Sequence, residues 1–327
     1  MEWIPGAIST LFNQLILLIS GFVLLTLLGN MLLFKRRTRI YRSDFRRLKE
    51  QEKESRMVLQ HRNQLRDRTR SYEQSLTYAH RIQRAMFLTA SQLNANFPES
   101  FIYHKPKEIV SGDFNWARQI NGKMLFAVAD CTGHGVPGAF MSLIGLEFFR
   151  QITVGKGILD PAGILNEMNR QFDIVFGDTT EIALKDGIDL ALCSYDYKNR
   201  LLEYAGAFNS LYIVRNQEII EIKGDRIIVG PDYGVQRGHF QNRSIEIRDK
   251  DILYMFTDGY PDQFGGPEGK KFKYRRFRHL LMSISHMSME EQQKKLEENM
   301  NEWMGNREDQ IDDQTIIGIR PASFSSS

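Results

Sequence analysis

The sequence has 327 residues, of which 42% are apolar and 25% charged, and its formal net charge is +3. This length corresponds to one or two domains of ordinary size, and this composition excludes disordered and collagen-like chains. The two cysteines, Cys131 and Cys193, exclude a disulfide framework and a cysteine zinc site, and they favour a reducing compartment. Residues 35–70 hold 14 Lys and Arg but only five Asp and Glu, so the rest of the chain is mildly acidic. That distribution argues against a nucleic-acid-binding protein with a generally basic surface.

The N-terminal segment is apolar enough to cross a membrane. No charged residue stands between Glu2 and Lys35, and residues 11–34 are mostly apolar. A helix needs roughly 20 such residues to cross the hydrocarbon core. A signal peptide carries its positive charges before the apolar run, whereas here KRRTRIYR follows it, so we expect a retained, single-pass anchor. The positive-inside preference then places everything after the anchor in the cytoplasm. The alternative is a buried core helix.

A long polar helix is expected over residues 35–88, which contain no Pro and no Gly and are rich in good helix formers. Apolar residues recur there at intervals of seven, which predicts a seam that pairs with a second copy of the chain. Arg62 and Thr69 interrupt the companion series, so a single solvated helix remains open. The basic residues near the membrane also suit anionic lipid. The seam consists of Val58, Leu65, Tyr72, Ala79 and Met86, with Leu76 and Ile82 between them.

From about residue 97 the pattern changes to short apolar runs separated by Gly, Asn and Asp. Residues 123–130 (KMLFAVAD) and 251–258 (DILYMFTD) each predict a buried strand that ends in an aspartate. Amphipathic helices are expected over residues 138–154 and 288–304. This mixture lacks a regular βαβ rhythm and therefore predicts an α+β fold with largely antiparallel sheets. Further strands are expected at 189–195, 201–205, 211–214, 218–222 and 314–320.

Several aspartates stand at the ends of these strands or beside tight turns, with no basic residue immediately adjacent. They are Asp113 in SGDF, Asp130 in ADCTGHG, Asp258 in FTDG, and Asp312 and Asp313 in IDDQT. One such aspartate is commonly a turn or cap residue. A set of them gathered at one end of a sandwich would repel one another unless a hard cation neutralised them, and all-oxygen ligands suit magnesium or manganese. A pair of such ions activates a bound water and clamps phosphoryl oxygens.

Five motifs follow one another with consistent spacing: SGDFNW, LFAVADCTGHGVPGAFMSLIG, KDGIDLALC, FTDGYPDQFGG and IDDQTIIGIR. Together they closely resemble the SpoIIE-like branch of the PPM metal-dependent protein serine/threonine phosphatases, over roughly residues 76 to 320. The resemblance implies an α-β-β-α sandwich of two mainly antiparallel sheets with two divalent metal ions, manganese or magnesium.

The resemblance also implies roles for individual residues. Asp130 resembles the bridging metal ligand, with the carbonyl of Cys131 beside it, and Asp113 resembles a ligand that acts directly or through water. Asp258 with Asp312 would hold the other ion. In IDDQT the first aspartate falls where the family's ligand stands, which leaves Asp313 as an accessory position.

Other positions are left open. His134 comes four residues after Asp130, whereas the eukaryotic branch has a histidine two residues after the aspartate, so a general acid and a helix-entry histidine both remain. Asp189 and Asn209 are accessory positions, the latter in AGAFNS where relatives have an AGHNP-like sequence. Lys105 and Lys107 would meet the substrate phosphate as point charges or are exposed loop lysines.

These expectations divide the chain into an anchor (1–34), a basic helical linker (35–88), a phosphatase domain (89–321) and a disordered tail (322–327). For the linker, a coiled coil that acts as a switch helix and a passive tether both remain open. The resemblance implies a phosphatase in the bacterial cytoplasmic (inner) membrane. It would act on phosphoserine or phosphothreonine of a cytoplasmic regulatory protein, such as an antagonist of an anti-sigma factor in partner-switching signalling. We expect a homodimer through the linker. A catalytically silent docking module and a hydrolase of small phosphate esters are the alternatives.

Overall fold

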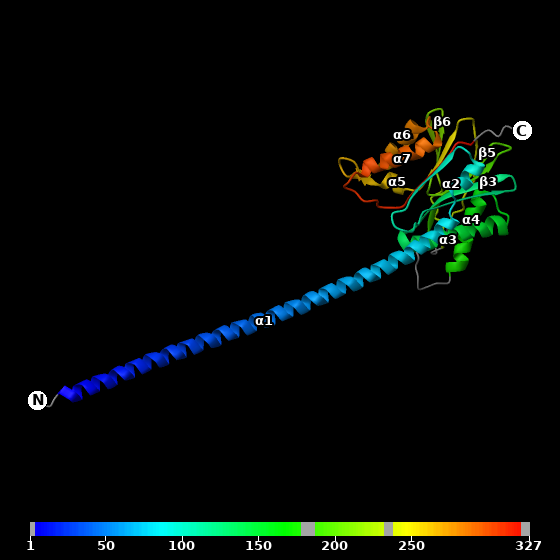
Figure 1. Cartoon of the computed structure of the whole chain (residues 1–327). Coiled ribbons are helices and arrows are strands. Elements are labelled where there is room, and N and C mark those ends of the chain that lie inside the picture. The colour runs from blue at the N-terminus through cyan, green and yellow to red at the C-terminus, as the bar shows by residue number, and fades with distance from the viewer. Residues whose placement is uncertain (1–3, 178–186, 232–237, 322–327) are drawn as a thin grey trace. The chain divides into compact units, whose positions relative to one another are not determined.

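The computed structural model describes residues 4–177, 187–231 and 238–321. The chain divides into two units, Met1–Tyr72 and Glu73–Ser327, called here the N-terminal and C-terminal units. Helix α1, Ile4–Met86, runs through the first and ends in the second (Figure 1). The expected tail, residues 322–327, lies outside the described residues.

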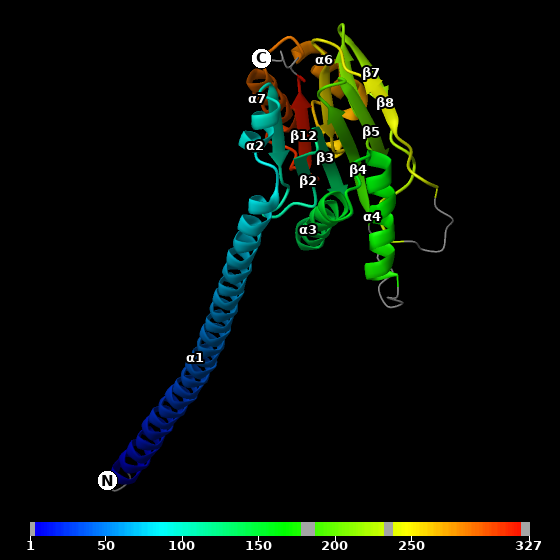
Figure 2. The same cartoon turned by 90° about the vertical axis from the view of Figure 1, so that its right-hand side faces the viewer.

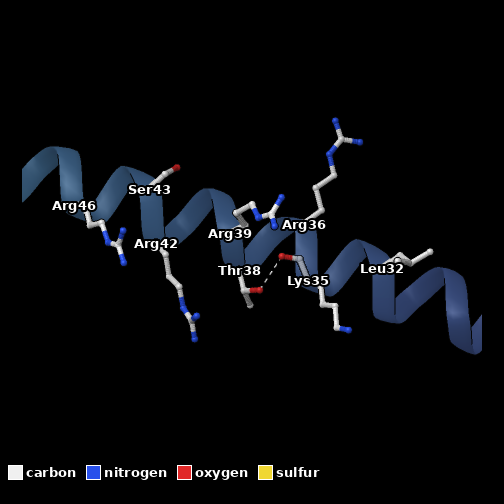
Figure 3. A pocket seen from close by; sticks show the side chains of 8 residues that line it. All are labelled: Leu32, Lys35, Arg36, Thr38, Arg39, Arg42, Ser43 and Arg46. Atoms are coloured by element: carbon white, nitrogen blue, oxygen red, sulfur yellow. Dashed lines mark hydrogen bonds between the residues drawn. The ribbon is translucent and has the colours of Figure 1, made fainter.

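From residue 4 onward the N-terminal unit consists of α1 alone, and nearly all of its described side chains are exposed. By length and composition, α1 is the one helix among the described residues that is long and apolar enough to cross a membrane. After the apolar run, basic side chains extend from more than one side of the helix (Figure 3). Lys35, Arg39, Arg42 and Arg46 recur at spacings of four, three and four residues and so share one face of the helix, whereas Arg36 extends from another side. These basic side chains are Lys35, Arg36, Arg39, Arg42 and Arg46.

The C-terminal unit contains two five-stranded antiparallel sheets and a two-stranded ribbon. The first sheet has the order β1 (Ser100–Lys105), β12 (Gln314–Ile319), β9 (Ile252–Phe256), β6 (Leu211–Arg215) and β7 (Glu218–Ile222). The second has the order β2 (Phe114–Ile120), β3 (Lys123–Cys131), β4 (Ile188–Asp196), β5 (Leu201–Ala207) and β8 (Arg243–Glu246). The ribbon pairs β10 (Phe264–Gly265) with β11 (Lys270–Lys271). The expected α+β class with antiparallel sheets is confirmed.

Helices cover the outer face of each sheet. Helices α3 and α4 pack on the second sheet (Figure 2), and α6 and α7 pack on the first. A short helix α2 follows α1, a π-helical turn η1 extends α3, and α5 follows β9. The layers are thus helix, sheet, sheet, helix. The helix bounds are α2 (Ala90–Asn96), α3 (Gly135–Arg150), η1 (Gln151–Gly155), α4 (Pro161–Phe176), α5 (Gly259–Asp262), α6 (Lys273–Ile284) and α7 (Met289–Met304).

Local sequence signals explain where several helices begin. Thr89 caps α2 and Ser288 caps α7, each in a reciprocal capping box with the residue three positions later. The side chain of Asp160 accepts a hydrogen bond from the Gly163 amide at 2.8 Å, and Pro161 occupies the first turn of α4. These caps satisfy amide groups that the helices themselves leave without partners.

The buried side chains form three apolar layers, and β3 contributes to two of them because its residues alternate between faces. Leu125, Ala127 and Ala129 pack with α3 and α4. Met124, Phe126 and Val128 pack between the two sheets. The same alternation directs the next even-numbered residue, Asp130, toward the space between the sheets, at the edge where β3 ends.

Candidate metal centre

One edge of the sandwich collects the aspartates that the sequence singled out. Asp130 at the end of β3 stands directly opposite Asp189 at the start of β4 in the antiparallel register. Thr257 and Asp258 follow β9, and Asp312 and Asp313 precede β12, which pairs with β9 in antiparallel fashion. Like charges directly opposite each other destabilise a strand pair. The edge therefore carries an excess of negative charge that its own sheets do not relieve.

Asp113 is the most deeply buried of these aspartates, at 1% exposure. Its Oδ2 accepts hydrogen bonds from the hydroxyls of Thr257 at 2.7 Å and Thr315 at 2.8 Å. Burial raises the pKa of Asp113 well above its usual range, and the charges of Asp313 and Asp312 raise it further, against the effect of the two hydroxyls. The two threonines thus tie Asp113, which directly precedes β2 of the second sheet, to the end of β9 and the start of β12 in the first.

Asp130 lies at the centre of the electrostatic interactions. Burial raises its pKa well above the usual range, and four neighbouring carboxylates add to this rise. Burial likewise raises the pKa of Asp258, with contributions from Asp262 and Asp312, and it raises the pKa of Asp312. Burial and Asp258 raise the pKa of Asp189 to about 6. The four neighbours of Asp130 are Asp113, Asp258, Asp312 and Asp189.

Two glycines allow the loops to approach closely enough for this. A Cβ on Gly112 would lie 2.7 Å from the carbonyl oxygen of Gly133 and 3.2 Å from that of Cys131. A Cβ on Gly259 would collide with the backbone carbonyl of Asp313. The absence of side chains therefore brings Asp113 beside the end of β3, and Asp258 beside Asp312.

Asp313 differs from its neighbour Asp312. Its Oδ1 accepts a hydrogen bond from the Lys107 amide and its Oδ2 accepts one from the Gly112 amide, both at 2.7 Å. Asp313 is 3% exposed, so both of its oxygens serve the backbone of the loop that leads to Asp113. Asp312 is half-buried, and its Oδ1 accepts a hydrogen bond from the Asp313 amide at 2.8 Å. Asp313 thus holds the loop, whereas Asp312 faces the other carboxylates.

The remaining predicted residues are placed differently from one another. Lys105 donates to Asn301 of α7 at 3.2 Å, whereas the charge of Lys107 acts on Asp312 and opposes the rise that burial causes in its pKa. His134 is exposed at the start of α3, with its Nδ1 2.6 Å from Oε1 of Glu108, and its charge also opposes the rise in the pKa of Asp312. Lys107 and His134 therefore lie near the carboxylates, and Lys105 is engaged elsewhere.

The side chain of Cys131 packs away from the carboxylates, and Asn209 forms a hydrogen bond through its backbone carbonyl. The Cys131 side chain packs in the apolar layer beneath α3 and α4, and burial raises the pKa of its thiol well above the usual range. Its carbonyl, not its sulfur, is therefore the candidate ligand. The carbonyl of Asn209, between β5 and β6, accepts a 2.5 Å hydrogen bond from the Tyr204 hydroxyl. The Asn209 side-chain nitrogen is buried and has no partner among the described residues.

Sequence reasoning missed some residues at this edge. Thr257 and Thr315 stand inside the FTDG and IDDQT motifs, on the inward-facing parity of their strands, so the alternation could have identified them. Tyr274, near the start of α6, gave no such signal. Burial raises its pKa, and so do the charges of Asp258, Asp262 and Asp130, which places its hydroxyl beside the carboxylates. Lys271 pairs with Asp262 at 2.7 Å on the same side.

The donor set fits a hard divalent cation. Among the described residues no Lys, Arg or His forms an ion pair with Asp113, Asp130 or Asp258, and the ligand atoms offered are all oxygens. Within the same ranges, no three His, Cys, Asp or Glu side chains are already close enough to surround an ion. The carboxylates converge and raise one another's pKa values, and bound cations would relieve that repulsion.

Comparisons with known proteins agree with this architecture. The family described as Stage II sporulation protein E (SpoIIE) matches residues 120–321. The SiaA-PP2C domain of Pseudomonas aeruginosa is 34% identical, with a TM-score of 0.70, over 77% of this chain and 98% of that one. No curated protein sequence matches the chain.

Two more distant structures share the fold. One is the PP2C phosphatase domain of SpoIIE from Bacillus subtilis with a fragment of its regulatory domain, at 17% identity and a TM-score of 0.54, over 68% of this chain and 62% of that one. The other contains the RsbU and RsbW domains of a Mycobacterium tuberculosis protein, at 19% identity and a TM-score of 0.53, over 68% of this chain and 60% of that one.

Proposed function

Because the chain belongs to the SpoIIE family of PP2C-type (PPM) phosphatase domains, we propose that it is a membrane-anchored, metal-dependent protein serine/threonine phosphatase. The observation that carries the proposal is the convergence of Asp113, Asp130, Asp258 and Asp312 at one edge of the sandwich, where none of them forms an ion pair with a Lys, Arg or His among the described residues. A domain that served only for docking would gain nothing from this mutual repulsion.

The proposal assigns the ligands as follows. Asp130 with Asp113 and the carbonyl of Cys131, and Asp258 with Asp312, would hold two manganese or magnesium ions, and Asp130 would be the ligand shared between them. Bound ions of this kind activate a water for attack on phosphorus and neutralise the phosphoryl oxygens. Asp130 and Asp113 are thus the catalytic carboxylates.

The other residues of the site prepare and orient these groups. Thr257 and Thr315 donate to one oxygen of Asp113 and leave its other oxygen to face the centre. Asp313 fixes the loop before Asp113. Lys107 supplies a positive charge at the rim for the substrate phosphate. The same role for Lys105 would require it to leave Asn301, and His134, Asp189 and Asn209 remain accessory positions.

The proposed substrate is a phosphoserine or phosphothreonine on a cytoplasmic regulatory protein of a partner-switching system, such as an antagonist of an anti-sigma factor. The family supports this choice, as does the shared fold with a structure that contains an RsbU and an RsbW domain. The divisions at residues 34, 88 and 321 are part of the proposal.

Residues 11–34 would span the bacterial cytoplasmic membrane once. The basic residues of α1 that follow the apolar run would then remain on the cytoplasmic side, with the phosphatase domain. The linker would join two copies through its exposed seam. A reporter fused to the C-terminus that is active only outside the cytoplasm would contradict this orientation.

A direct assay tests the activity. The full-length protein, purified in detergent, is given phosphoserine and phosphothreonine peptides and p-nitrophenyl phosphate, with manganese or with a chelator. We expect manganese-dependent release of phosphate from the peptides, and none from the Asp258→Asn variant, which controls for contaminating phosphatases. Turnover of p-nitrophenyl phosphate alone would favour a small-ester hydrolase. No turnover of either, with manganese bound, would favour a docking module.

A further inference from the structure

The last turn of α1 carries a buried polar side chain that the proposed mechanism does not use. Gln83 is 2% exposed, although the rest of α1 is largely exposed. Its Nε2 donates to the backbone carbonyl of Ser111 at 2.6 Å, and its Oε1 accepts from the backbone amide of Ser111 at 3.1 Å. The side-chain amide thus satisfies both backbone groups of one fully buried residue, as a neighbouring strand would.

The same side chain reaches a third element. Nε2 of Gln83 also lies 3.0 Å from the hydroxyl of Ser142 in α3, and that hydroxyl donates to the Ala139 carbonyl at 2.8 Å. Helix α3 begins directly after the loop that follows Asp130. Gln83 therefore connects the end of α1 with both chain segments that lead into the carboxylate edge.

The position of Ser111 relates this connection to Asp113. Ser111 stands two residues before Asp113, and the intervening Gly112 donates its amide to Asp313. The loop is consequently held from one side by the Gln83 amide and from the other by the Asp313 carboxylate. Because these hydrogen bonds fix the loop on both sides, the backbone of Asp113 has little freedom to move, and the direction of its carboxylate is fixed with it.

We propose that Gln83 is a positioning residue for Asp113, which sets the affinity of the centre for its divalent cations. This inference rests on the proposed function, because it takes Asp113 as a metal ligand. Glutamine suits the role because its amide supplies one acceptor and two donor hydrogens in one plane. Asparagine would be too short to reach Ser111 and Ser142 together. Glutamate would set an acceptor against the Ser111 carbonyl.

The test uses the full-length protein with Gln83→Met, which keeps the length and volume of the side chain and removes its hydrogen bonds. Manganese binding is measured by isothermal titration calorimetry, and phosphate release from a phosphopeptide is measured across manganese concentrations. We expect manganese affinity to fall by about tenfold, as for changes behind metal ligands, with kcat at saturating manganese and KM for the peptide largely retained. Gln74→Met, at an exposed position in the same helix, is the matched control and should bind manganese as the unmodified protein does.

Ser142→Ala removes one of the three hydrogen bonds and should weaken manganese binding in the same direction by a smaller factor. It decides the matter if Gln83→Met does not fold, as judged by circular dichroism. Unchanged manganese affinity in a folded Gln83→Met, or in Ser142→Ala when that variant decides, would overturn the role of Gln83. If the unmodified protein binds manganese and hydrolyses no phosphopeptide, the proposed function fails while the calorimetry still tests the positioning role.

Discussion

The polar part of helix α1, after its apolar run, contains two regions of similar composition and different surroundings. From Arg39 to Tyr72 its side chains are exposed, whereas in its last turns Leu76 and His80 are half-buried and Gln83 is buried, followed by buried Phe87. These four positions lie on one face of the helix, at spacings of three and four residues. The seam positions at intervals of seven, from Val58 to Met86, remain exposed, with Tyr72 at 70% and Met86 at 46%. A polar helix can therefore end as part of a folded core without any change in its composition, because its packing partner decides which residues are buried.

The largest expected contrast concerns carboxylates. Asp130→Asn in the C-terminal unit should reduce phosphate release by more than about 100-fold, since changes merely behind metal ligands already cost 10–100-fold. Asp67→Asn removes a carboxylate from the N-terminal unit and should leave turnover unchanged. Phosphopeptide assays at saturating manganese measure both. Near-normal turnover by Asp130→Asn would show that the carboxylate edge is not the reaction centre.

The next contrast is between two aromatic residues, buried Phe87 just after the end of α1 and exposed Tyr72 within it. Phe87 is 8% exposed and packs edge-on against His104 in the apolar layer below α3, so Phe87→Ala should destabilise the C-terminal unit by about 3 kcal/mol. Tyr72→Ala should change stability by less than about 0.5 kcal/mol because its side chain is exposed. Urea unfolding followed by tryptophan fluorescence measures both, since Trp116 stacks on Phe149 in this unit. Equal effects would abolish the distinction between the two regions of α1.

A pH experiment sharpens the picture of the carboxylate edge. The folded-state pKa of Asp189 is raised to about 6, so the folded protein holds this proton at pH values where the unfolded chain has lost it. Stability of the metal-free protein should therefore fall as pH rises from about 4 to about 6. Asp189→Asn should reduce that fall. Melting temperatures at several pH values in chelator measure it, and an identical pH dependence in the variant would contradict the raised pKa.

A substitution in the heptad seam of α1 is expected to have the smallest effect on the stability of the C-terminal unit. Leu65→Glu places a charge at an exposed seam position, so it should weaken self-association of the full-length protein without changing the unfolding of the C-terminal unit. Analytical ultracentrifugation in detergent gives the association state. A monomeric unmodified protein would remove the coiled-coil interpretation and leave the single helix.

Sequence reasoning succeeded where the pattern is local. The strand expected at 218–222 is found at Glu218–Ile222, and the one at 123–130 is found at Lys123–Cys131, since alternation and turn residues record these strands directly. It also predicted that the aspartates gather at one end of the sandwich, and they lie at the same edge because the ends of paired strands lie side by side. Helix α4 was not predicted, although Asp160 as an N-cap and Pro161 in the first turn indicate the start of a helix.

Other features depend on contacts between distant parts of the chain and leave no local pattern. Gln83 looks like any other residue of a polar helix until Ser111 lies against it. Asp313 differs from Asp312 only because two backbone amides, 206 and 201 positions earlier, donate to it. Tyr274 is placed near Asp258 by the packing of α6, not by its own neighbours in sequence.

The tight turns of the sheets lie at the edge opposite the aspartates. The turns after β2, β4 and β6 each contain residues with positive φ, including Asn121, Arg200 and Asn216. Insertions at these turns lengthen a loop far from the aspartates and leave every strand in register. One extra residue within β3 would instead turn Asp130 toward α3 and exchange the two apolar faces of the strand. Peptide tags and fluorescent labels therefore belong in these turns, and natural variation in chain length is best accommodated there.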